Sequence, residues 1–137
     1  MNNDERRVVE AAVTTIGALP IIPERRLGNA RVLRLLATAT TMAILRKFEA
    51  LPDGETIAEF GTALRSRFPD GAHLIDDDAL TAIIRSAHGF DDAPEDTDPA
   101  RVRLLLRLLP YALCSENEST QDELTSFVDD ILAATTA

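Results

Sequence analysis

The stretch RVLRLLATATTMAILRKF, residues 31–48, decides the fold class because its apolar side chains cover most of a helical wheel. The apolar positions are Leu33, Leu36, Ala37, Ala39, Ala43, Ile44 and Phe48. The polar positions form one narrow stripe at i, i+3, i+7 and i+10, namely Arg31, Arg34, Thr38 and Thr41. A helix that is apolar on most sides lies at the centre of a bundle or in a subunit interface. We therefore predict a central helix over about residues 24–50, with Leu33, Leu36, Ala37, Ile44 and Phe48 buried.

Five further segments have helical periodicity, at about residues 4–19, 56–68, 77–88, 98–110 and 120–133. The segment that follows Asp98 is also apolar on most sides, whereas the other four are one-sided. We predict an all-α fold: a compact bundle of five or six helices, in which two central apolar helices are wrapped by amphipathic ones. The length fits a single helical domain over residues 1–137.

Local signals mark several of the predicted helix ends. Asp76, Asp98 and Thr120 stand where an N-terminal cap is expected, because their side-chain oxygens can accept hydrogen bonds from the first free backbone N–H groups. Pro110 cannot donate a hydrogen bond to the carbonyl of Leu106, so the fifth helix is expected to end or kink there.

The composition agrees with a helical, metal-independent fold. Leu and Ala together number 38 and Val and Ile together 15, which favours helix over sheet. A chain of this length can bury a sizeable core without a disulfide or a metal. The single cysteine, Cys114, excludes an internal disulfide and a multi-thiolate zinc site.

Charge is distributed unevenly along the chain. The net charge is −9, yet residues 1–50 carry eight basic and five acidic side chains, while residues 51–137 carry six basic and eighteen acidic ones. This asymmetry indicates a dipolar surface or an acidic face that binds a partner. A nucleic-acid partner is not expected, because a helix-turn-helix reading of residues 56–88 would put Asp77 and Asp78 against phosphates.

The sequence also predicts a cytoplasmic protein that does not bind membranes. The first residues show no apolar core of a secretory signal. No stretch approaches the roughly 18 apolar residues of a membrane span.

Candidate catalytic and metal-binding residues each have a simpler structural explanation. Three consecutive aspartates, residues 76–78, could hold a cation, but capping at a helix start accounts for them. His73 and His88 lack the Glu-x-x-His spacing of a di-metal bundle, and Cys114 has no histidine at a defined spacing. We expect no metal, no cofactor and no catalytic residue, and we favour a non-enzyme while leaving an enzyme open.

These observations favour a non-catalytic helical protein–protein interaction module, such as a small acidic adaptor, inhibitor or immunity-type protein. Its expected partner is a basic protein or a second copy of the chain in a homodimer. The alternative is a regulatory protein that binds a small ligand or an anion through Arg31 and Arg34. In either case the expected binding residues are Arg31, Arg34, Thr38 and Thr41.

Overall fold

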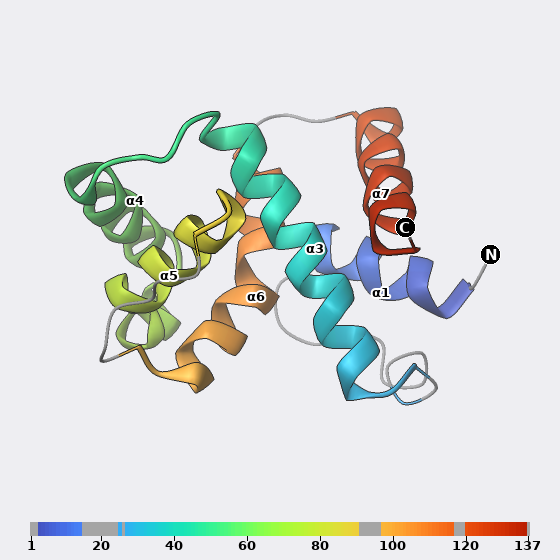
Figure 1. The fold of residues 1–137 in the computed structure, drawn as a ribbon, viewed down its shortest axis with the longest axis horizontal. Helices are drawn as coiled ribbons and strands as arrows, with labels where there is room; N and C mark the ends of the chain where they lie inside the picture. Colours follow the sequence, from blue (N-terminus) through green and yellow to red (C-terminus); the bar gives the residue numbers. More distant parts are fainter. Residues whose placement is uncertain (1–2, 15–24, 26, 91–96, 117–119, 137) are drawn as a thin grey trace. The chain divides into compact units, whose positions relative to one another are not determined.

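A computed structural model describes residues 3–14, 25, 27–90, 97–116 and 120–136 (Figure 1). Its elements are α1 (Asn3–Thr14), α3 (Asn29–Lys47), α4 (Gly54–Arg67), the 3-10 helix η1 (Pro69–Leu74), α5 (Asp77–Ala87), α6 (Pro99–Cys114) and α7 (Gln121–Thr136). Every regular element in these residues is helical, which confirms the predicted all-α class. The part of the first predicted helix beyond Thr14 lies outside the described residues.

The chain divides into two compact units. Unit 1 comprises residues 1–43 and 106–137, and unit 2 comprises residues 44–105. Both boundaries fall within a helix, after Ala43 in α3 and before Leu106 in α6. The single domain expected from the sequence stays a prediction.

In unit 1, α1 packs against α7. Both helices are amphipathic, and their buried apolar side chains are Val8, Val9, Ala12 and Val13 on α1 and Phe127, Val128, Ile131 and Leu132 on α7. At the edge of this contact, Arg6 donates a hydrogen bond to Asp129, which raises the pKa of the arginine. Burial of apolar side chains therefore stabilises the contact between α1 and α7, and the ion pair between Arg6 and Asp129 lies at its edge.

The buried face of α3 is narrower than the sequence predicted. Its buried residues are Val32, Leu35, Leu36, Ala39, Thr40, Ala43 and Ile44, which follow helical spacing along one stripe. Burial is confirmed for Leu36 and Ile44, whereas Ala37 and Phe48 are only half-buried. The prediction for Leu33 is wrong, because this side chain is 40% exposed. Leu33 lies at the edge of the stripe, and its neighbour Val32 takes the inward position.

The start of α3 also differs from the expected one. The helix begins at Asn29 and not near residue 24, because Gly28 has a backbone φ of 84°, in the left-handed region that favours glycine. The carbonyl of Gly28 then accepts the first helical hydrogen bond, from Val32 N at 3.1 Å.

A buried hydroxyl connects α3 to α6 within unit 1. Thr40 is fully buried, and its Oγ1 donates to the carbonyl of Leu36 at 2.7 Å and to the carbonyl of Leu106 at 3.3 Å. In a regular helix the Leu106 carbonyl would accept a hydrogen bond from the backbone N–H of residue 110. Pro110 has no N–H, so this hydrogen bond is missing from α6. A hydroxyl carries one proton, so the two carbonyls share it. Thr40 thus supplies a donor where α6 lacks one.

Pro110 does not end α6, which corrects one of the two outcomes expected from the sequence. The helix continues through the proline to Cys114, and Ser115 N still donates to the carbonyl of Tyr111 at 2.9 Å. Pro110 itself is buried. The hydroxyl of Thr40 lowers the cost of the interior proline, because the freed carbonyl keeps a partner.

In unit 2, α4 packs against α5 and η1. The core of this packing contains Ile57, Phe60 and Leu64 from α4 and Leu80, Ile83 and Ile84 from α5. Gly61 permits a close approach, because a Cβ there would overlap the carboxylate of Asp77. Arg65 holds that carboxylate at 2.9 Å and also donates to the carbonyl of Ile75 at 3.1 Å. Phe48 meets Phe60 edge to face, with ring centroids 5.6 Å apart.

Side-chain caps begin the helices where the sequence predicted them. Asp76 accepts from Asp78 N, Asp98 from Ala100 N and Thr120 from Glu123 N. A fourth cap, Asp53, accepts from Thr56 N at 2.8 Å and begins α4. The hydrogen bonding of Asp53 with Thr56 stabilises the charged carboxylate of Asp53 and lowers its pKa.

The Thr40 contact predicts a difference between two adjacent threonines of α3. The variant Thr40→Val should lower the free energy of unfolding by about 1 kcal/mol, since it removes the hydrogen bond to the part-buried Leu106 carbonyl, which Pro110 cannot serve. The matched control is Thr41→Val, on the half-exposed side of the helix, which should change stability by less than about 0.5 kcal/mol. Urea denaturation of both variants measures the difference, and equal effects would show that the buried hydroxyl contributes nothing.

Candidate interaction surfaces

The four residues predicted to bind a partner or an anion follow the solvent side of α3 in unit 1. Arg34 is exposed, and Arg31, Thr38 and Thr41 are partly exposed. All four residues are at least partly accessible to solvent, and their role in binding stays a prediction.

Arg31 is already bound within the protein. Its Nη2 lies 2.9 Å from Oε1 of Glu5 on α1, and its Nε lies 3.1 Å from the same oxygen. The carboxylate is the more buried partner, with 13% of the Glu5 side chain exposed against 25% of Arg31. An anion at Arg31 would have to displace Glu5 from this pair. The contact joins α1 to α3, so we assign Arg31 a structural role.

Arg34 and Thr38 differ in whether their polar side-chain groups are free to bind a partner. Arg34 makes no side-chain hydrogen bond or ion pair with any described residue. The hydroxyl of Thr38 donates to the carbonyl of Arg34 at 2.9 Å, within the same helix. Arg34 is therefore the one cation of the predicted stripe that is available to a partner, and anion binding through the pair Arg31 and Arg34 stays a prediction.

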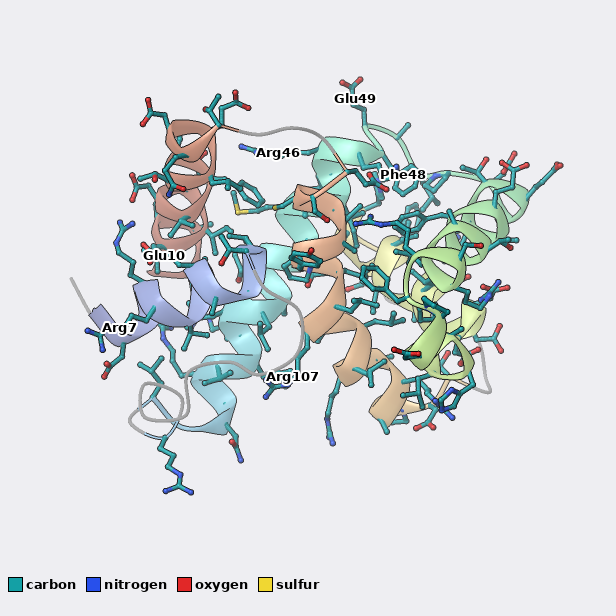
Figure 2. All side chains as sticks on the ribbon, turned by 180° about the vertical axis from the view of Figure 1, so that it is seen from behind. Arg7, Glu10, Arg46, Phe48, Glu49 and Arg107 are labelled. Carbon is teal, nitrogen blue, oxygen red and sulfur yellow. The ribbon has the colours of Figure 1, made fainter. Side chains whose placement is uncertain are left out.

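Unit 2 carries a second feature, which the sequence reasoning did not assign to particular residues. Five of its exposed carboxylates make no ion pair or hydrogen bond with any described residue: Glu49, Glu55, Glu59, Asp70 and Asp78. Figure 2 shows Glu49 extending away from the ribbon. Two of these carboxylates, Glu55 and Glu59, are one helical turn apart on α4, where like charges destabilise a helix slightly.

The cations of unit 2 are mostly occupied by partners from the same unit. Arg65 binds Asp77, and Arg101 lies 3.9 Å from Asp98. Others lie over aromatic rings: Lys47 over Phe48 and Phe60, Arg67 over Phe68, and Arg85 over Phe90. These contacts hold the positive charges against the chain and leave the five carboxylates without neutralising neighbours. The spacing of Glu55 and Glu59 opposite the buried Ile57 and Phe60 is the sequence signal that could have located this surface.

Residues with possible catalytic chemistry are dispersed. His73 is exposed, Cys114 is half-buried, and His88 caps the end of α5 with its Nε2 buried and without a hydrogen-bond partner. Within the described ranges, no three His, Cys, Asp or Glu side chains come close enough to hold a metal ion. Two of the three consecutive aspartates have structural roles, because Asp76 caps α5 and Asp77 binds Arg65.

The comparisons with known proteins give no relative from which a function could be carried over. No family model, no curated protein and no solved structure matches this chain. None of the described helices has the length and apolar character required to cross a membrane.

The Arg31–Glu5 pair predicts that replacing Arg31 lowers stability more than replacing Arg34 does. Arg31→Ala should lower the free energy of unfolding by about 1 kcal/mol, because it leaves a mostly buried carboxylate without its cation. Arg34→Ala should change it by less than about 0.5 kcal/mol, since no described residue pairs with this side chain. Thermal and urea denaturation of the two variants test this order, and a larger loss for Arg34→Ala would contradict the assigned roles.

Proposed function

We propose that the protein is a non-catalytic interaction module whose unit 2 binds a basic surface of another protein. The observation that supports this function is the set of five exposed carboxylates without partners, Glu49, Glu55, Glu59, Asp70 and Asp78. A basic partner would neutralise them on binding, and complementary charge would also speed the encounter.

Two features of α4 make this surface more than a solvated helix face. Glu55 and Glu59 repel one another at i, i+4 spacing, which folding alone does not favour. The two cations of α4, Arg65 and Arg67, are engaged with Asp77 and Phe68 and do not offset that repulsion. The arrangement keeps negative charge at the surface. This pattern fits an acidic inhibitor, adaptor or immunity-type protein, which we place in the cytoplasm.

Affinity capture with a neutralised variant tests this function. The variant Glu55→Gln/Glu59→Gln removes two charges and keeps the side-chain shapes, so it should retain less of any basic protein that the wild type captures from the source cell's lysate. Capture should also fall as salt rises above about 0.15 M, because screening weakens contacts between exposed charges.

The matched control is Asp122→Asn/Glu123→Gln in α7, which changes the net charge equally but lies in unit 1. It should leave capture unchanged. An equal loss in both variants would mean that binding follows net charge alone, and capture that is insensitive to the α4 variant would contradict the proposed function.

A further inference from the structure

Two phenylalanine rings of unit 2, which we call the aromatic corner, lie against an ammonium group. Phe48 follows the last residue of α3 and Phe60 belongs to α4; their ring centroids are 5.6 Å apart and their planes lie at 80° to one another. The Nζ of Lys47 is 5.6 Å from the centroid of Phe48 and 5.3 Å from that of Phe60. At these distances the negative face of each ring attracts the cation.

The aromatic corner fits an ammonium better than a guanidinium. Lys47 is the only lysine of the chain, and every other cationic side chain among its fourteen Lys and Arg residues is an arginine. The arginines of unit 2 that lie over aromatic rings each contact one ring, Arg67 over Phe68 and Arg85 over Phe90. A planar guanidinium stacks on one ring, whereas a compact ammonium can face two rings set at a right angle.

The ammonium in the aromatic corner can be exchanged at little cost. Lys47 is exposed and is the residue that ends α3, so its side chain can leave the rings without breaking a helix. A cation–π contact at an exposed site changes an equilibrium by only about two- to fivefold. Phe60 is 6% exposed and belongs to the core, while Phe48 is half-buried and accessible to a ligand.

The residues next to the aromatic corner in the sequence carry the charge that a cationic ligand needs. Each phenylalanine has an exposed glutamate beside it, Glu49 after Phe48 and Glu59 before Phe60. Neither carboxylate has a partner among the described residues. Figure 2 shows Phe48 and Glu49 just beyond the end of α3. Aromatic rings with acidic neighbours favour an ammonium ligand over a neutral one.

We propose that the aromatic corner binds a lysine side chain of the basic partner, and that Lys47 occupies the corner when the partner is absent. The inference rests on the proposed function, and it adds the side chain that the partner presents and the rings that recognise it. Binding exchanges one ammonium for another at the same two rings. Lys47 is thus a competitor within the chain, and it lowers the affinity of the corner for a lysine ligand.

Titration of tetralysine into the full chain at about 0.15 M salt tests this exchange, with the dissociation constant taken from NMR shifts of the backbone amides. Lys47→Ala removes the competitor and should tighten binding by about two- to fivefold. Lys47→Ala/Phe48→Leu also removes one ring and should lose this gain. The matched control is Arg46→Ala, which changes the net charge equally on the neighbouring residue and should tighten binding clearly less.

Tetralysine acetylated at every Nε lacks the side-chain ammonium groups and should not shift the amides of the aromatic corner. Circular dichroism melting of each variant is the folding control, and the comparison of Lys47→Ala with Arg46→Ala decides the matter if Phe48→Leu unfolds the chain. Equal gains in those two variants overturn the inference, as does a gain that survives Phe48→Leu. Failure here is separable from failure of the proposed function, because capture of a basic protein through Glu55 and Glu59 does not require the rings.

Discussion

The meeting of α3 and α6 in unit 1 depends on one hydroxyl, that of Thr40. Pro110 leaves the Leu106 carbonyl of α6 without its helical donor, and the fully buried Thr40 lies 3.3 Å from that carbonyl. Leaving this part-buried carbonyl without a donor would cost free energy, so the position of α3 and the tolerance of α6 for an interior proline are linked. The half-exposed polar stripe of α3 follows from the same constraint, because turning Thr40 inward turns Arg34 and Thr41 toward solvent.

The distribution of charge gives the two units different surfaces. In unit 2 five of the cations bind carboxylates or lie over aromatic rings, and five carboxylates are exposed without a partner among the described residues. In unit 1 Arg31 is paired with Glu5, and Arg34 is exposed without a partner among the described residues. Because no described residue pairs with the five carboxylates of unit 2, we propose that they serve binding.

The helices and their caps could be predicted from the sequence, because they depend on local chemistry. Apolar periodicity located the helices, and Asp76, Asp98 and Thr120 cap them as expected. The predictions were wrong or incomplete where contacts with residues distant in the sequence determine the pairing or burial of a side chain. Nothing near Arg31 in the sequence indicates that Glu5 binds it, and the helical wheel of α3 cannot show that Val32 and Leu35 face inward while Leu33 faces outward. The spacing of Glu55 and Glu59 opposite Ile57 and Phe60 could have located part of the acidic surface of unit 2, but the engagement of its cations is tertiary and could not be predicted.

The central claim, that Thr40 replaces the donor that Pro110 removes, is tested most directly by a double-mutant cycle. Pro110→Ala gives α6 an N–H that can serve the Leu106 carbonyl. The cost of Thr40→Val in the free energy of unfolding should then be smaller by about 1 kcal/mol in the Pro110→Ala chain than in the wild type. Equal costs in the two chains would show that the hydroxyl and the proline act independently, and would contradict the account.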